Sequence, residues 1–293
     1  MIGLFGGNGY VGQEFTKQLV NRELPFHEFH LNDFNYLDKD ILLKIFSEFQ
    51  FSFVINCAGY VGKPNVDACE DNKNATFEGN VTFPNHLAEM CVLFNIPLGQ
   101  ISSGCLFQDY KFDSDLGWTE EDEVSSEGSY YTYTKKLCEA NIPQIQKDSY
   151  LWRLRFPFNE VDGPRNYLTK IQTYKKLLDA ENSLSHLGDF VSACLDLYEN
   201  RAPYGKYNIV NSGSTSARAV AAKIKEILNL DKDFDFFEND EEFYTFGAKA
   251  PRSNCVLDNS KLIKVGGVNI RSVDEAIEDS LNKWIAQNET SNA

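Results

Sequence analysis

Two groups of residues in this chain have types and spacing that could carry out chemistry, and the first is rich in glycine. Residues 6–12 (GGNGYVG) follow the pattern G-x-x-G-x-x-G between a predicted strand, Ile2–Phe5, and a helix predicted to run to about Asn21. Glycines there let the backbone approach a pyrophosphate and aim the N-terminus of the helix at it. The pattern also occurs in plain turns, but the strand–helix context favours a dinucleotide site. Its expected residues are Gly6, Asn8, Gly9, Tyr10, Val11 and Gly12.

The second group is Tyr131-x-x-x-Lys135, at the start of the predicted helix Tyr131–Ile145. Residues four apart lie on one face of a helix. A lysine beside a tyrosine is expected to lower the pKa of the phenol and make it a proton donor near neutrality. Ser103, at the end of a predicted strand, can hold a ketone oxygen alongside. Chance alone supplies about one such pair among 14 tyrosines, so the position of this pair carries the prediction.

The choice of coenzyme is not decided by these residues. An acid at the end of the second strand would favour a free ribose hydroxyl, and an arginine would favour a 2′-phosphate. The segment His27–Asp33 contains acids but no arginine. We expect Asp38 to lie near the adenine.

Strand and helix patterns alternate through the first half of the chain, which predicts an α/β fold. The expected strands are Phe26–Leu31, Phe51–Cys57, Leu98–Ser102 and Tyr150–Phe156, and the helices between them include Leu42–Phe49 and Phe83–Phe94. This alternation is typical of a Rossmann-type, doubly wound parallel sheet. We predict a dinucleotide-binding domain over residues 1–157. Residues 158–293 are predicted to form mainly a smaller C-terminal substrate-binding lobe, with some segments returning to the first domain.

One segment of the second half allows two interpretations. Residues 230–246 are dense in acidic and aromatic side chains. They are either a solvated face over packed rings or a mobile flap near the substrate.

Composition excludes several classes of protein. The net charge of −15 argues against a nucleic-acid partner, because such binding needs a basic surface. No stretch approaches the ~18 apolar residues of a membrane span, and no basic leader follows Met1, so we expect a cytoplasmic protein. The seven cysteines form no C-x-x-C pair and there are only four histidines, which predicts reduced thiols and no metal site.

Several segments together resemble one family. They are Gly62–Asp67, Cys69-Glu70, Ser103–Phe107, Leu116–Asp122, Tyr131…Lys135, Pro164–Ile171 and Ala250–Asn254. On these residues the chain resembles the extended short-chain dehydrogenase/reductases, and within them the dTDP-4-dehydrorhamnose reductase branch. It is most similar there to the bifunctional nucleotide-sugar 3,5-epimerase/4-reductases.

The resemblance implies roles for individual residues. Ser103, Tyr131 and Lys135 match the reductase triad, and the coenzyme of the family is usually NADPH, with NADH not excluded. Cys105 and Lys170 match the epimerase pair, with the acid and the base unassigned. A 4-ketone acidifies C3 and C5, and inversion needs a proton taken from one face and returned to the other. A thiolate near a lysine has a lowered pKa and can act as the base.

The remaining expected site residues fall into two sets. The cofactor set adds Ala58, Gly59, Tyr60 and Asn80 to the residues above. The substrate set is Arg165, Asn166, Arg252 and Asn254, in which arginine forks pair oxyanions.

The activity that the resemblance implies is NADPH-dependent conversion of a UDP- or dTDP-linked 4-keto-6-deoxy-hexose to an L-sugar such as L-rhamnose. Two alternatives lie close to it: a GDP-4-keto-6-deoxy-sugar epimerase/reductase, and a 4-reductase without epimerisation. A third, of another class, is a non-catalytic NADP(H)-binding regulatory subunit. The partner is expected to be a nucleotide-diphosphate sugar, and the oligomeric state is open, with a homodimer as one option.

Overall fold

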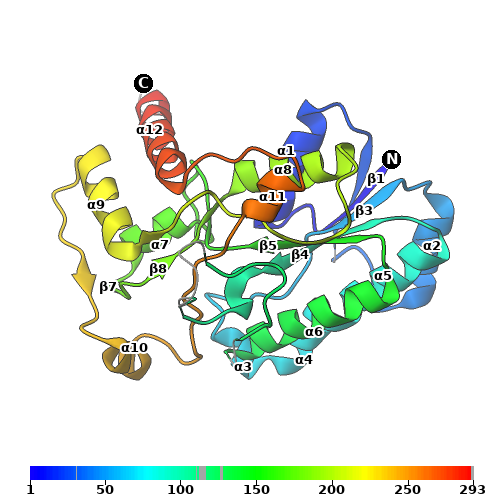
Figure 1. The fold of residues 1–293 in the computed structure, drawn as a ribbon, viewed down its shortest axis with the longest axis horizontal. Helices are drawn as coiled ribbons and strands as arrows, with labels where there is room; N and C mark the ends of the chain where they lie inside the picture. The colour runs from blue at the N-terminus through cyan, green and yellow to red at the C-terminus, as the bar shows by residue number, and fades with distance from the viewer. Residues whose placement is uncertain (31, 110, 112–116, 126–127, 292–293) are drawn as a thin grey trace.

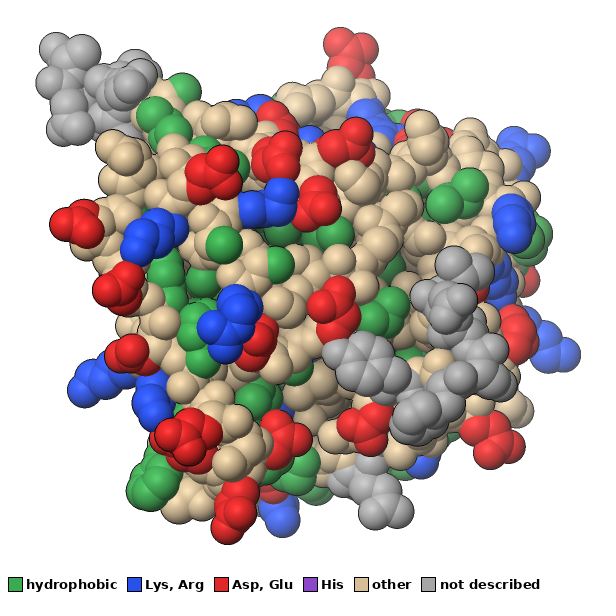
Figure 2. Space-filling model, turned by 60° about the vertical axis from the view of Figure 1, so that its left-hand side comes forward, with side chains coloured by type: hydrophobic (Ala, Val, Ile, Leu, Met, Phe, Trp, Pro, Cys, Tyr) green, Lys and Arg blue, Asp and Glu red, His purple; other side chains and the backbone are tan. Residues whose placement is uncertain are grey.

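The computed structural model describes residues 1–30, 32–109, 111, 117–125 and 128–291. Leu31, at the end of one predicted strand, and Leu116, in one of the segments that carry the family resemblance, lie outside the described residues. None of the described helices is both long and apolar enough to cross a membrane. Acidic side chains are spread over the face shown in Figure 2, as the net charge of −15 requires.

Six parallel strands form the central sheet, which confirms the predicted fold class (Figure 1). In sheet order they are β10 (Gly205–Asn208), β5 (Ser149–Leu154), β4 (Leu98–Ser103), β3 (Phe53–Asn56), β1 (Ile2–Phe5) and β2 (Phe26–Phe29). The chain leaves β1 toward β2 and returns to build β3 on the other side of β1. Ligands of such sheets bind at the carboxyl ends of the strands that flank this switch point.

Helices cover both faces of the sheet. One face carries α1 (Tyr10–Asn21) and α8 (Leu187–Glu199), and the other α2 (Lys39–Glu48), α5 (Phe83–Leu93) and α6 (Tyr130–Ile145). Successive strand residues point to opposite faces. Leu4 therefore packs with α1 and α8, whereas Phe5 packs with α2 and α5. A π-helical turn, Glu78–Thr82, joins α4 (Lys73–Phe77) to α5, and α3 (Ala68–Asp71) precedes them.

The second half builds a smaller lobe around its own core. Its main helices are α7 (Tyr167–Thr173), α9 (Ala217–Ile227) and α12 (Val273–Ser291), with α10 (Asp240–Phe246) beyond them, whereas α11 (Ser260–Lys264) packs on the main sheet at β10. Three two-stranded ribbons complete it: β6 (Pro157–Phe158) with β9 (Ser185–His186), β7 (Lys176–Leu177) with β12 (Asp235–Phe236), and β8 (Glu181–Asn182) with β11 (Thr215–Ser216). Phe158, Leu168 and Ile277 lie in the core of this lobe. The predicted boundary at residue 157 stays a prediction. Two elements that follow it belong to the main sheet: β10 is its edge strand, and α8 covers one of its faces.

The acidic, aromatic segment 230–246 folds into β12 and α10. The ring centres of Phe237 and Phe243 are 5.2 Å apart, and Cζ of Arg218 lies 4.0 Å from the centre of the Phe236 ring. No side chain of α10 is buried, and Phe246 is 79% exposed. The segment thus has the packed rings and solvated acids of the first interpretation, together with an exposed ring at its end.

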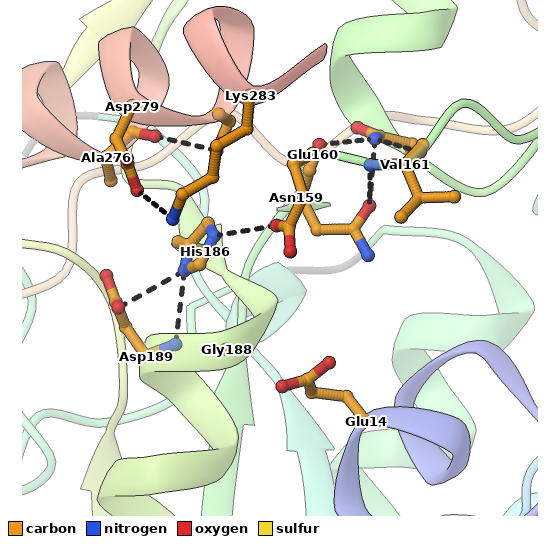
Figure 3. A network of polar contacts seen from close by, with 12 residues as sticks. Glu14, Asn159, Glu160, Val161, His186, Gly188, Asp189, Ala276, Asp279 and Lys283 are labelled. Atoms are coloured by element: carbon orange, nitrogen blue, oxygen red, sulfur yellow. Dashed lines mark hydrogen bonds and ion pairs between the residues drawn. The ribbon is translucent and has the colours of Figure 1, made fainter. Parts of the chain in front are cut away.

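A buried histidine joins the two parts of the molecule (Figure 3). His186 accepts a hydrogen bond at Nδ1 from the backbone N–H of Asp189, 3.2 Å away, and its Nε2 lies 3.6 Å from Glu160. Arg271 donates to Asp189 at 2.7 Å. Burial acts to raise the pKa of Asp189, but the nearby His186 ring and the hydrogen bonds that the carboxylate accepts from Arg271 and Asn211 lower it to about 2. The carboxylate therefore ties the start of α8 to the segment before α12.

The lowered pKa of Asp189 predicts a loss of stability in acid. A carboxylate with a depressed pKa stabilises the fold at pH values above its unfolded pKa of about 4, and this contribution disappears as the pH falls toward 2. We expect Asp189→Asn to lower the free energy of unfolding by about 2 kcal/mol at pH 7. Urea titrations at pH 7 and pH 3 measure the difference, which should shrink at pH 3.

A matched control for this variant is Asp233→Asn, which alters the exposed Lys225–Asp233 pair. It should leave unfolding nearly unchanged. A pH-independent effect of Asp189→Asn would contradict the assignment of its charge.

Candidate active site

The glycine-rich turn after β1 is packed so closely that side chains cannot enter it. Gly6 has φ +83°, and a Cβ there would lie 2.7 Å from the backbone N of Ala58. A Cβ on Gly12 would lie 2.1 Å from the carbonyl oxygen of Gly6. The start of α1 has no side-chain cap and no acidic residue in its first turn. Free N–H groups at a helix start bind phosphate, so this turn fits the pyrophosphate of a dinucleotide.

An acid from β2 lies beside this turn and was not singled out from the sequence. The carboxylate of Glu28 would be 2.8 Å from a Cβ on Gly7, and it accepts a hydrogen bond from Thr16. Asp38, predicted to lie near the adenine, instead caps α2 by accepting from the N–H groups of Asp40 and Ile41. Its carboxylate is engaged because the helix start needs an acceptor.

The turn after β3 is held by a buried amide. Asn80 accepts a hydrogen bond from the Tyr60 N–H at 2.8 Å and donates to the Tyr60 carbonyl at 2.9 Å and to Thr134 at 3.1 Å. It is fully buried. Asn80 therefore connects Gly59–Tyr60 to α6 by hydrogen bonds. The contact with the cofactor that the sequence suggested stays a prediction. Gly59 borders the site, because a Cβ there would lie 3.8 Å from Lys135 Nζ.

The predicted triad comes together at the carboxyl end of β4. Ser103 is the last residue of β4 and Tyr131 is the second residue of α6, and the two side chains lie close enough for Ser103 to act on the pKa of the phenol. Lys135 Nζ lies 5.9 Å from the centre of the Tyr131 ring and donates to the Ile101 carbonyl at 3.1 Å. A hydroxyl, a phenol and an ammonium therefore line one corner beside the turn after β3.

The expected lowering of the Tyr131 pKa is not found. Burial raises the pKa of the phenol, and a charge on Cys105 would raise it further, while the hydrogen bond with Ser103 acts the other way. Burial disfavours the phenolate. In this state Tyr131 is firmly protonated, which suits a proton donor.

Cys105 lies in the same corner, and Lys170 lies in a group of cations. Burial raises the pKa of the Cys105 thiol, against hydrogen bonds with Ser103 and Thr132 and the charges of Arg155 and Lys135. The lowered pKa expected for this thiol is therefore not found either. Burial lowers the pKa of Lys170, and the charges of Arg165 and Arg252 lower it further. Both groups are shifted toward their neutral forms.

Three of the predicted substrate residues already hold hydrogen bonds or an ion pair within the protein. Arg165 donates to the Gly62 carbonyl at 2.8 Å. Arg252 is paired through both arms with Asp67, with N–O distances of 2.7 Å. Asn254 accepts from Asn182 at 3.2 Å.

Asn166 has a structural place in the lobe. It is fully buried, caps α7 through the Leu168 N–H, and donates to the carbonyls of Asn159 and Val161. Both N–H groups of its amide are used by the loop before α7, and its side-chain oxygen accepts from the Leu168 N–H. Tyr10 reaches the same loop, since its hydroxyl donates to Asn159 Oδ1 at 3.1 Å.

Comparison with known proteins places this arrangement in a family. A family model described as the RmlD substrate binding domain matches residues 1–285. The chain belongs to this family. The predicted membership of the dTDP-4-dehydrorhamnose reductase branch is thereby confirmed.

Curated relatives of this RmlD-family chain include two from Arabidopsis thaliana. A bifunctional dTDP-4-dehydrorhamnose 3,5-epimerase/dTDP-4-dehydrorhamnose reductase is 30% identical over 230 residues, which are 77% of this chain and 75% of that protein. A trifunctional UDP-glucose 4,6-dehydratase/UDP-4-keto-6-deoxy-D-glucose 3,5-epimerase/UDP-4-keto-L-rhamnose-reductase is 28% identical over 286 residues. That match takes in 96% of this chain, which spans only 41% of the trifunctional relative.

Solved structures share the fold of the RmlD-family chain along almost its whole length. The L780 UDP-rhamnose synthase of Acanthamoeba polyphaga mimivirus superposes with a TM-score of 0.88 at 23% identity, over 96% of this chain and 98% of that one. A dTDP-4-dehydrorhamnose reductase of Bacillus anthracis, solved in complex with NADP, gives 0.82 at 18% identity, over 98% of both chains.

The packing of the glycine turn predicts the effect of a single methyl group. Gly12→Ala must push α1 away from Gly6, because its Cβ would overlap the Gly6 carbonyl. We expect it to cost about 1–3 kcal/mol of stability and to weaken NADPH binding at least about tenfold. Thermal unfolding and the fluorescence of bound NADPH measure the two effects.

Gly163→Ala is the matched control, since a Cβ there meets no atom within 4 Å. It should change neither quantity. Equal behaviour of the two variants would show that the turn tolerates displacement and does not form the phosphate site.

Proposed function

We propose that this chain is an NADPH-dependent reductase of a nucleotide-linked 4-keto-6-deoxy-hexose that also epimerises the sugar at C3 and C5. The observation that carries the proposal is the meeting of Ser103, Tyr131 and Cys105 at the carboxyl end of β4, beside the glycine turn and Gly59. The two Arabidopsis relatives support it, because their names combine a 3,5-epimerase with a reductase. The name of the bifunctional relative gives a dTDP-linked sugar and that of the trifunctional relative a UDP-linked sugar, and we propose one of these two nucleotides for the substrate.

The reduction uses the triad. NADPH, when bound on the glycine turn, supplies the hydride. Ser103 holds the ketone oxygen at C4 by a hydrogen bond, and Tyr131, protonated because it is buried, gives that oxygen its proton. Lys135 donates a hydrogen bond to the Ile101 carbonyl, which keeps its ammonium near the Tyr131 ring. This positive charge stabilises the phenolate that remains after the proton transfer.

The epimerisation uses Cys105 and Lys170 before reduction. A carbon next to the C4 ketone loses its proton to one of these groups, and the electron pair moves into an enolate whose oxygen is held by Ser103 and Tyr131. The other group then protonates the carbon from the opposite face. Burial favours a neutral thiol, which can give a proton, and a neutral amine, which can take one.

The substrate's diphosphate is proposed to bind the cations of the second lobe. Arg165 and Arg252 lie close enough to Lys170 to lower its pKa, so these charges share one region of an otherwise acidic protein. Asp67 is the carboxylate that holds Arg252 in place through both arms. Domain division at residue 157 and the substrate role of Asn254 remain part of this proposal.

The first experiment measures NADPH oxidation at 340 nm with UDP- and dTDP-linked 4-keto-6-deoxyglucose. We expect Tyr131→Phe to lower kcat by about 10²-fold or more, because the proton donor is lost. Tyr133→Phe, a half-exposed tyrosine two residues further along α6, should retain full activity. Binding of NADPH without oxidation of either ketone would favour a non-catalytic subunit and overturn the proposal.

The second experiment runs the reaction in deuterium oxide and analyses the product by NMR. The wild type should incorporate deuterium at both C3 and C5. Cys105→Ser and Lys170→Met should each lose at least about tenfold in incorporation, because one face has lost its proton carrier. Lys175→Met, an exposed lysine beyond the end of the same helix, is the matched control. Reduction without deuterium in the wild type would mean a 4-reductase only.

A further inference from the structure

Arg153 in β5 and Arg155 just after it both extend into the interior of the protein, and among the described residues only Arg153 has a carboxylate partner. Arg153 is fully buried and pairs with Glu139 through two bonds, from Nε at 2.9 Å and from Nη2 at 2.8 Å. Arg155 is also buried, with 4% exposure. Among the described residues, no carboxylate pairs with Arg155.

The hydrogen-bond partners of Arg155 are neutral. Its Nη2 donates to the Asn182 side-chain oxygen and to the Ser253 carbonyl, and Nη1 donates to the Ser253 hydroxyl at 3.4 Å. Nε is buried and has no hydrogen-bond partner among the described residues. A buried cation is normally paired, because the loss of hydration costs more than neutral partners return. Besides these bonds, Cζ of Arg155 lies 4.3 Å from the centre of the Phe156 ring, a cation–π contact. No carboxylate of the described residues compensates the charge of Arg155 inside the protein.

Two groups near this charge can become negative, Cys105 and Tyr167, because Arg155 acts to lower the pKa of both. Cys105 is the one that the proposed epimerisation uses. The side chain of Arg155 passes under the turn that carries the thiol, since a Cβ on Gly104 would lie 3.0 Å from Arg155 Cδ. The charge of Arg155 acts to lower the pKa of Cys105, against the burial that raises it. Ser253 also joins Arg155 to this turn, because its hydroxyl donates to the Phe107 carbonyl.

We propose that Arg155 is a positioning residue. Its guanidinium, which no carboxylate of the described residues pairs, stabilises the thiolate of Cys105 when that thiolate forms. The inference rests on the proposed epimerisation. Whichever of Cys105 and Lys170 takes the proton first, Cys105 is a thiolate at one stage, either after giving its proton to the sugar carbon or before taking one from it. At that stage the thiolate and the guanidinium compensate each other in the interior, and the role proposed for Arg155 is exerted through Cys105.

The test measures the charge state of Cys105 without catalysis. Alkylation of the folded protein by iodoacetamide is followed from pH 6 to pH 11, and the Cys105 peptide is quantified by mass spectrometry, because only the thiolate reacts. Arg155→Gln should raise the midpoint by about one pH unit, which is a tenfold loss of thiolate at neutral pH. Arg155→Lys, which keeps the charge, should restore most of it.

A second variant leaves Arg155 in place and neutralises it. Asn182→Asp replaces the amide whose oxygen already accepts from Arg155 by a carboxylate. It therefore gives Arg155 a counterion, as Glu139 is the counterion of Arg153. It should raise the midpoint in the same direction, and it decides the question if Arg155→Gln does not fold. Arg218→Gln, which removes an exposed cation of α9 paired with Asp179, should not move the midpoint.

The outcomes separate this inference from the proposed function. An unchanged midpoint in Arg155→Gln, or in Asn182→Asp if the first does not fold, overturns the role of Arg155 even if the wild type exchanges deuterium. A raised midpoint in a wild type that exchanges no deuterium would keep the electrostatic link and reject the epimerase. If both hold, the pH profile of deuterium incorporation should shift with the alkylation midpoint, which a purely structural arginine would not cause.

Discussion

The close contact between the turns after β1 and β3 is the constraint on which the site depends. The Cα of Gly6 faces the backbone of Ala58 with no room for a methyl group, and Gly12 brings α1 against the same point. This contact fixes the start of α1 relative to the turn that contains Gly59. Asn80 then fastens that turn to α6, which carries Tyr131 and Lys135. The positions of the proposed phosphate site and of the proposed proton donor are thus set by one backbone contact and one buried amide.

Electrostatics in the site runs against the character of the whole chain. The protein carries 43 acidic and 28 basic residues, yet Arg165, Lys170 and Arg252 lie near one another in the second lobe. Cations gathered within an acidic surface attract an anionic ligand to one place and leave the rest of the surface repellent to it. The Asp67 carboxylate fixes the orientation of the Arg252 guanidinium, because it binds both of its arms.

The sequence was sufficient for the features that depend on neighbouring residues. The strand and helix patterns, the glycine turn and the spacing of Tyr131 and Lys135 are local, and each appears in the structure near its predicted bounds. Asp38, Asn80 and Asn166 were harder, because the partners that occupy an amide or a carboxylate are set by the fold. The raised pKa of Tyr131 was missed for a similar reason: burial is a property of the packed site, and it is the largest influence on this pKa. Likewise, only the packed interior distinguishes Arg153, with its carboxylate, from Arg155 two residues later.

The hydrogen bond from Tyr10 to Asn159 has a consequence for how the two parts of the molecule move. Asn159 also receives the amide of Asn166, which caps the helix that carries Lys170. The first residue of α1 and the cap of α7 therefore share one side-chain oxygen. A rotation of the second lobe relative to the sheet must therefore stretch this bond or move the start of α1 as well, so the glycine turn and the helix that carries Lys170 are mechanically coupled.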